Sequence, residues 1–277
     1  MKVTETLPTC CESIIGDVGV IDGILDLYDP ISLQEMKKVR LMNRVDTKYV
    51  TTKSVLARLL SMANSEYMVQ TIDSRTNMPY YTMYFDTPDC HMYMEHLHGR
   101  KRRQKIRVRK YENSGTAFLE IKKKNNKGRT AKKRIEWSGG DDVGYAEFIG
   151  SNSAYKFSHL SRRLENRFRR ITLVNRQMTE RLTIDSDLRF HNIVSGKACS
   201  LDDLVIIELK RDGMAASPVT SMLRTLRIHP AKFSKYCIGM ALTDDALKKN
   251  RFKPRIMMVN RLTRIVTGNE SLFVSHT

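Results

Sequence analysis

Residues 103–137 read RQKIRVRKYENSGTAFLEIKKKNNKGRTAKKRIEW, which is three alternating runs joined by two polar turns that contain glycine. Alternation at every second residue is typical of a strand with two different faces. The charged members share one face of each run: Lys105, Arg107 and Arg109, then Glu120, Lys122 and Lys124, then Lys132, Arg134 and Glu136. The stretch predicts two hairpins in series, with one apolar face and one cationic face.

The cationic face needs a physical reason. Like charges opposite one another on neighbouring strands are destabilising, so a sheet does not acquire such a face for its own stability. Burying these charges unpaired in an apolar core is very costly. Two interpretations remain open at this point: a solvated outer face, or a water-filled cavity that holds a polyanion.

Composition narrows the class of partner. The chain has 277 residues and a formal net charge of +18, from 48 Lys and Arg against 30 Asp and Glu. This charge implies an anionic partner: nucleic acid, a membrane surface or phosphate-rich small molecules. The five cysteines form no CxxC pair, and no apolar run approaches the roughly 20 residues of a membrane span. We therefore expect a soluble protein of the cytoplasm with reduced thiols.

Other runs have strand character, and nearly all of them carry a charged face: Arg44–Tyr49, the aromatic-rich Tyr80–Thr87, Ile171–Phe190 with a hairpin break near Thr179, and Leu204–Lys210. Helical spacing occupies 32–41, about 52–63, 88–99, 155–169, 219–229 and 233–249, and 191–202 is expected to be a polar loop. Because inward and outward positions alternate along every strand of a barrel, we predict an α+β fold with a closed antiparallel β-barrel, a polar bore and helices outside.

The expected organisation has three parts. Residues 1–30 form a loosely packed lead-in segment, 31–250 form a single tunnel-barrel catalytic domain, and 251–277 form a basic C-terminal tail. The sequence predicts no oligomeric state.

Eight motifs, taken together, resemble a known family. The motifs RVDTKYV, YFDT, KIRVRKY, LEIKKK, AKKR, RLTID, LVIIELK and FSKY resemble the catalytic polyphosphate polymerase domain of the vacuolar transporter chaperone complex and its bacterial relatives, over roughly residues 40–247. That family belongs to the triphosphate tunnel metalloenzymes. The resemblance implies transfer of the ATP γ-phosphate to a growing inorganic polyphosphate chain, with Mn²⁺ or Mg²⁺ as cofactor.

The resemblance also implies site residues. Positions that match tunnel residues binding the triphosphate and the chain are Lys48, Arg107, Arg109, Lys122, Lys132, Arg134, Arg176, Arg181 and Lys235, and Glu208 matches the metal-binding glutamate. We expect catalytic roles for Lys48, Arg107, Arg109, Lys122, Arg176 and Arg181, and ligand-binding roles for Lys132, Arg134 and Lys235. We also expect ligand-binding roles for Lys105, which shares a strand face with Arg107 and Arg109, and for Lys210, which shares a strand face with Glu208.

One difference from the family's hydrolytic relatives bears on whether the chain is a polymerase or a hydrolase. Hydrolytic relatives open with a Glu-x-Glu-x-Lys strand, whereas this chain has Arg44 where the first glutamate would stand, followed by Asp46 and Lys48. A hydrolase must activate water, which is a task for an inward carboxylate. Asp46 and Glu120 are available for it, so a tunnel triphosphatase is the alternative, and the missing glutamate favours the polymerase. The inositol-phosphate-sensing domain and membrane spans of the eukaryotic polymerase are not recognised here, so no regulation or translocation is implied.

The remaining alternatives are weaker. A nucleic-acid-binding module would need aromatic side chains on the cationic face, and Trp137 alternates away from it, so we expect no nucleic-acid partner. The spacing of Cys90, His91, His96 and His98 matches no standard zinc pattern. Glu136 and Asp185 are expected to be salt-bridge partners of the cations rather than metal ligands.

Overall fold

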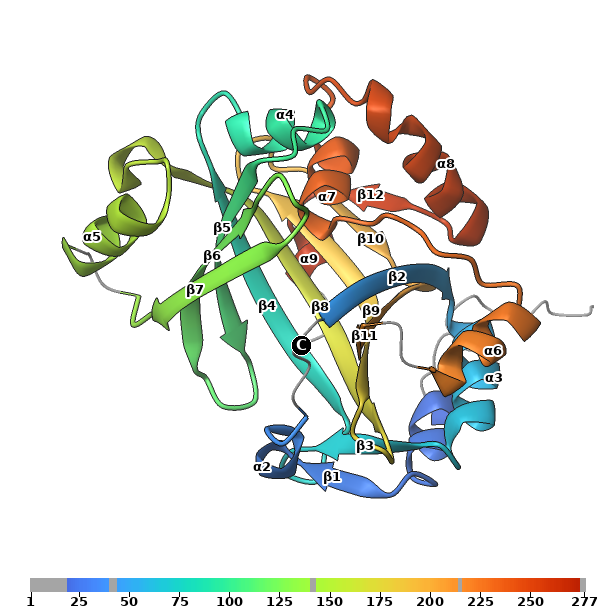
Figure 1. Cartoon of the computed structure of the whole chain (residues 1–277). Helices are drawn as coiled ribbons and strands as arrows, with labels where there is room; N and C mark the ends of the chain where they lie inside the picture. The colour runs from blue at the N-terminus through green and yellow to red at the C-terminus, as the bar shows by residue number, and fades with distance from the viewer. Residues whose placement is uncertain (1–18, 40–43, 140–142, 214–215, 275–277) are drawn as a thin grey trace, which may run out of the picture. The chain divides into compact units, whose positions relative to one another are not determined.

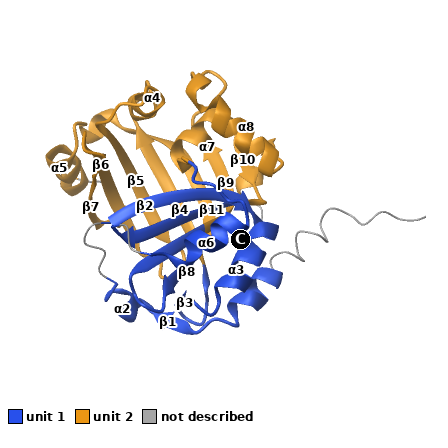
Figure 2. Cartoon of the chain, turned by 45° about the vertical axis from the view of Figure 1, so that its right-hand side comes forward, with its two compact units in different colours: residues 1–77, 171–184, 205–231 blue, residues 78–170, 185–204, 232–277 orange. Residues whose placement is uncertain are grey.

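The computed structural model describes residues 19–39, 44–139, 143–213 and 216–274 (Figure 1). The chain divides into two compact units, coloured separately in Figure 2. Unit 1 comprises the chain up to Asn77 with Ile171–Ile184 and Val205–Ala231, and unit 2 comprises Met78–Arg170, Asp185–Leu204 and the chain from Lys232. None of the helices in the described ranges is long and apolar enough to cross a membrane.

Unit 2 is built on one sheet. Its strands are, in order of pairing, β12 (Val266–Gly268), β10 (Ala198–Leu201), the end of β9 (Glu180–Asn192), the start of β8 (Ser161–Asn175), β4 (Asn77–Asp86), β5 (Arg103–Tyr111), β6 (Ala117–Lys124) and β7 (Thr130–Glu136). Its helices are α4 (His91–Leu97), α5 (Val143–Asn152), η1 (Phe157–His159), α7 (Lys235–Thr243), η2 (Asn250–Phe252), α8 (Lys253–Leu262) and α9 (Ser271–Val274).

The predicted hairpins of residues 103–137 are confirmed as β5, β6 and β7, which pair antiparallel. Their apolar face is buried: Ile106 and Leu119 have no exposed surface and pack in one core with Ile149 of α5. The ring of Trp137 stacks on Tyr145 of the same helix, with centroids 4.3 Å apart. The opposite face carries the charges, as the alternation predicts.

Helix α7 packs tightly against this sheet. At Gly239 a Cβ atom would lie 2.5 Å from Cδ1 of Phe190 and 2.6 Å from Cδ2 of Leu164, far closer than carbon atoms approach. Only glycine allows the helix to sit at this distance from β8 and β9.

Unit 1 contains β1 (Pro30–Ser32), β3 (Tyr67–Thr71), the end of β8, the start of β9, β11 (Leu204–Asp212, from Val205) and β2 (Arg44–Thr52), paired in that order. Its helices include α2 (Leu33–Met36), α3 (Lys53–Ala63) and α6 (Pro218–Thr225). Thr52 caps α3, because its hydroxyl accepts a hydrogen bond from the amide of Val55. Leu56, Leu59 and Leu60 of α3 pack against the apolar faces of β9 and β11.

The expected closed barrel is wrong, although the α+β class and the antiparallel sheet with helices are confirmed. Among the described strands, β7 pairs only with β6, so its other edge is open. Strand β2 pairs only with β11, and its other edge is bridged at Tyr49 by Pro230 but by no described strand. Alternation reports that a strand has two faces. It does not report how many of its edges are paired.

Three local expectations are also wrong. The stretch 161–169, expected to be helical, is the first part of β8, and the expected loop 191–202 contains β10. The described part of the lead-in is not loosely packed, since Ile21, Leu25 and Tyr28 are buried in the core of unit 1. Residues 1–18 lie outside the described ranges. The single catalytic domain over 31–250 stays a prediction.

Candidate functional site: two cationic faces

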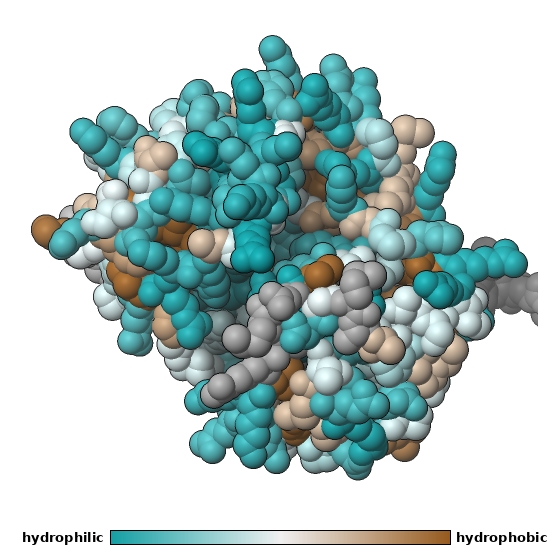
Figure 3. Space-filling model, viewed as in Figure 1, coloured by the Kyte–Doolittle hydropathy of each residue, from teal (hydrophilic) through white to brown (hydrophobic). Residues whose placement is uncertain are grey.

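The β5–β7 face of unit 2 is a ladder of charges in register. One row consists of Lys105, Lys122 and Lys132, and the next row consists of Arg107, Glu120 and Arg134. Neighbouring lysines in one row repel each other, which costs stability unless an anion lies over them. Figure 3, drawn from the same side as Figure 1, shows hydrophilic side chains gathered over the central part of β6 and β7.

Glu120 is the counterion of this ladder and is fully buried. Arg107 donates to Glu120 Oε2 from Nε at 2.8 Å and from Nη2 at 2.7 Å, and Lys132 forms an ion pair with the other oxygen. Burial alone would raise the pKa of Glu120, but Arg107, Arg109 and Lys132 outweigh burial and hold that pKa well below its usual range. The carboxylate therefore stays ionised and is a poor proton acceptor at neutral pH.

Arg109 is a buried cation of this face for which no ion pair with a carboxylate is seen among the described residues. Its side chain is buried, and Nε has no hydrogen-bond partner among the described residues. The guanidinium lies 5.6 Å from the ring centroid of Tyr80 and 5.8 Å from that of Phe168. Burial, with repulsion from Arg107 and Arg170, lowers the pKa of Arg109 to about 10. A bound anion would supply the charge partner that this site lacks.

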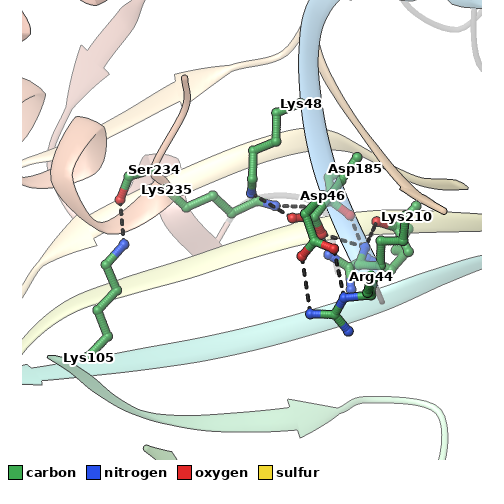
Figure 4. Close-up of polar contacts among 11 residues, drawn as sticks. Arg44, Asp46, Lys48, Lys105, Asp185, Lys210, Ser234 and Lys235 are labelled. Atoms are coloured by element: carbon green, nitrogen blue, oxygen red, sulfur yellow. Dashed lines mark hydrogen bonds and ion pairs between the residues drawn. The ribbon is translucent and has the colours of Figure 1, made fainter. Parts of the chain in front are cut away.

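Asp185 forms ion pairs with a second group of cations in unit 2. Arg170 of β8 donates to it from Nε at 2.5 Å and from Nη2 at 2.8 Å, and Lys235 at the start of α7 forms an ion pair with it (Figure 4). Burial would raise the pKa of Asp185, yet Arg170 and Lys235 hold it well below its usual range. The ammonium group of Lys235 also lies 4.0 Å from the centroid of Phe168. Asp185 is thus a salt-bridge partner, as expected.

The start of α7 is held in place by Asp86, the acidic residue of the YFDT motif. Buried Asp86 accepts hydrogen bonds from the amides of Met92 at 2.9 Å and Tyr93 at 3.0 Å, and from the hydroxyl of Tyr236 at 2.5 Å. Tyr236 follows Lys235 directly, so these bonds fix where Lys235 emerges. Sequence analysis assigned no role to Asp86.

Two further cations complete this face. Nζ of Lys105 donates to Oγ of Ser234 at 2.8 Å, which ties β5 to the residue that caps α7 (Figure 4). The guanidinium of Arg134 lies 4.4 Å from the ring centroid of Phe118, an aromatic side chain on the cationic face that sequence analysis overlooked. The arginine covers this ring, so the ring is not an open stacking platform.

Unit 1 carries its own cationic face around Glu208 of β11. Lys48 of β2 lies 3.2 Å from Oε1 of Glu208, and Lys210 lies 2.5 Å from Oε2. Lys210 also donates to Oγ1 of Thr183 at 2.9 Å. Burial would raise the pKa of Glu208, but Lys210 and Lys48 hold it well below its usual range. Arg181 lies two positions before Thr183 on β9 and so shares its face.

Two arginines of unit 1 are occupied locally. Nε of Arg44 lies 2.7 Å from Asp46 on the same strand (Figure 4), so the Asp46 carboxylate has a cationic partner. Arg176 lies in the turn after β8, where it donates to the carbonyl of Ser65 and to Asp29, each at 2.7 Å. The structure does not bring Arg176 into the Glu208 group. A signal for Arg170 was present, because it continues the alternation of Leu164, Asn166 and Phe168.

The metal assignment rests on Glu208 alone. No group of three or more His, Cys, Asp and Glu that could hold a metal ion occurs in the described part of the chain. The oxygen donors of Glu208 fit a divalent ion that takes its other ligands from substrate phosphates and water, as Mg²⁺ commonly does. Such an ion would compete with Lys48 and Lys210 for the carboxylate.

The two faces define a class of protein: an antiparallel sheet that displays arginine and lysine side chains. The chain belongs to the VTC domain family, whose model matches residues 43–244, and the resemblance inferred from the eight motifs is confirmed. No curated protein sequence matches the chain.

Three solved structures are similar to the chain at low sequence identity. A candidate adenylate cyclase from Bacillus halodurans is 15% identical with a TM-score of 0.46, covering 70% of this chain and 96% of that one. A candidate adenylate cyclase from Vibrio parahaemolyticus is 12% identical with a TM-score of 0.43, covering 72% and 99%. A candidate adenylyl cyclase from Hippeastrum, described as having a dominant triphosphatase activity, is 12% identical with a TM-score of 0.42, covering 72% and 96%.

Proposed function

We propose that the protein is a metal-dependent polyphosphate polymerase that transfers the γ-phosphate of ATP to the end of an inorganic polyphosphate chain. Membership of the VTC domain family supports an enzyme that acts on phosphoryl groups. Phosphoryl transfer depends mainly on positioning and on stabilising charge, which arginine and lysine side chains supply. Arg107, Arg109 and Lys122 on one face, and Lys48, Arg181 and Lys210 on the other, would bind phosphate oxygens.

One observation carries the choice of polymerase over hydrolase. Three of the carboxylates on these faces, Glu120, Asp185 and Glu208, are each bound by two cations. Their lowered pKa values make them weak bases. A terminal phosphate of a chain is already ionised at neutral pH and needs no base, whereas water does.

Arginine, lysine and Glu208 would have different roles in phosphoryl transfer. Arginine would grip phosphate oxygens with its bidentate fork, and lysine would follow the charge as a mobile ammonium. Release of lysines from their internal carboxylates would let them bind substrate. A divalent ion held by Glu208 would neutralise charge on the transferred phosphate.

The test is an incubation with ATP and Mn²⁺, followed by measurement of ADP and a gel stained for polyphosphate. We expect ADP and long polymer as products, and a shorter lag when short polyphosphate is added as acceptor. Release of orthophosphate or pyrophosphate without polymer, at high protein and Mn²⁺ concentrations, would establish the triphosphatase instead. Arg107→Ala is the control: if polymer is made on the β5–β7 face, this variant should make less of it than the wild type.

A further inference from the structure

A pocket of about 290 Å³ lies in unit 2 where β6 turns into β7. One wall is the segment from Gly99 to Arg103 that leads into β5, and the other wall is formed by residues 124–128. The lining consists of four cations, two asparagines and two glycines, and the cations are Lys101, Arg103, Lys124 and Lys127. It contains no carboxylate and no aromatic ring.

The charge in this pocket has no internal compensation. Within the described ranges, none of the four cations forms an ion pair with a carboxylate, in contrast to Arg107 and Lys132 on the same sheet. Burial, with repulsion from Arg103 and Lys232, lowers the pKa of Lys124. A second pocket of about 430 Å³, lined by Thr87 and by residues around His159, offers no lysine or arginine.

The walls are held by hydrogen bonds. The amide of Asn125 donates to the carbonyl of Arg129 at 2.9 Å, and the amide of Arg129 donates to Oδ1 of Asn125 at 3.0 Å. Gly128 takes a φ of +80°, which closes the turn. Next to the other wall, Nη1 of Arg251 donates to the carbonyl of His98, the residue before Gly99, at 2.6 Å. The pocket is therefore a shaped feature of the fold.

The pocket continues the cationic ladder. Arg103 pairs with Lys124 in the row next to Lys105 and Lys122, and the spacing of two residues keeps both rows on one face. Six residues separate Arg103 from Arg109 along β5, which corresponds to about 20 Å of extended strand. This distance exceeds the reach of the three linked phosphates of one nucleotide.

We propose that this pocket is a subsite for linear inorganic polyphosphate, which holds the part of the chain beyond the phosphates bound at Arg107 and Arg109. The inference deepens the proposed function and rests on it. The lining selects phosphate because its donors are ammonium, guanidinium and amide groups. Without an aromatic or apolar wall, the pocket has nothing to hold a nucleotide base.

The test measures binding with the full chain in metal-free buffer, by calorimetric titration with long-chain polyphosphate and with tripolyphosphate. Lys124→Ala combined with Lys127→Ala removes two pocket charges. The matched control combines Lys110→Ala with Lys133→Ala, which removes two exposed lysines from the opposite face of the same sheet. We expect the pocket variant to bind long-chain polyphosphate at least tenfold more weakly, about 1.4 kcal/mol, with affinity for tripolyphosphate changed less than twofold.

Three results would overturn the subsite: unchanged affinity for the long chain, an equal loss for tripolyphosphate, or an equal loss in the control variant. The last result would mean that only net charge matters. Binding without metal requires no turnover, so these outcomes are independent of the products made from ATP. A protein that releases only orthophosphate would refute the polymerase, whereas the titrations alone decide the subsite.

Discussion

Removing the charge of Glu120 tests whether an internal carboxylate stands where substrate phosphate binds. The change Glu120→Gln keeps the shape of the side chain and leaves Arg107 without its counterion. The Glu120 side chain is 0% exposed and that of Arg107 is 9% exposed, so the guanidinium would stay buried and uncompensated. Breaking a buried pair in this way costs about 3–5 kcal/mol. For a chain of this size, that lowers the melting temperature by roughly 6–20 °C.

Added polyanion should reverse much of this loss. Tripolyphosphate at 100 times its Kd stabilises a protein by about 2.7 kcal/mol, and the gain should be larger in the variant, because phosphate replaces the missing carboxylate. Thermal unfolding at pH 7.5, with and without tripolyphosphate, measures both effects. Glu112→Gln, which alters an exposed glutamate beyond the end of β5, is the control. The reasoning fails if the Glu120 variant melts with the wild type, or if ligand raises both melting temperatures equally.

Three further predictions concern other residues. Glu208→Ala should abolish divalent-ion-dependent turnover, and it should also lower the melting temperature because buried Lys210 loses its carboxylate partner. Full activity of the folded variant at saturating Mn²⁺ would exclude Glu208 as a ligand. Because the pKa of Arg109 is lowered to about 10, its charge is lost as pH rises through that value, and a bound anion raises the pKa again. Tripolyphosphate binding at pH 10 should therefore take up protons, seen as titration heats that depend on the buffer; Arg109→Gln should take up fewer. Gly239→Ala should destabilise the fold by about 1–3 kcal/mol in denaturant unfolding, because its Cβ would overlap Phe190; a neutral result would mean that α7 shifts freely.

The sequence predicted the β5–β7 meander well because its alternation is strict and its turns are polar. The first part of β8 was misread for a specific reason. Leu164 and Phe168 are four residues apart, and a spacing of four fits both one helical turn and a strand with a period of two. Asn166 between them is also buried, which settles the strand in the structure. Arg170 was missed together with the strand that carries it.

The sequence predicted which residues lie on the charged faces of the strands, but it did not predict which of these residues contact each other. Alternation places Lys105, Arg107 and Arg109 on one face, whatever their partners. It cannot show that Glu120 takes two hydrogen bonds from Arg107, or that Asp185 holds Arg170 and Lys235, because these contacts depend on register and on side chains from distant segments. Arg176 was expected in the site, but its side chain binds Asp29 and Ser65 instead. These two residues lie more than 100 positions from it in the sequence, so the alternation could not reveal the contact.

The open edge of β7 has a consequence for how two copies of the chain could meet. A strand paired on one side presents amide and carbonyl groups that could template a strand of another molecule. Along this edge β7 carries three consecutive cations, Lys132, Lys133 and Arg134, all exposed. A second copy approaching edge to edge would bring like charges together, so the same lysines and arginines that suit a polyanion also discourage fibril-like stacking of the sheet.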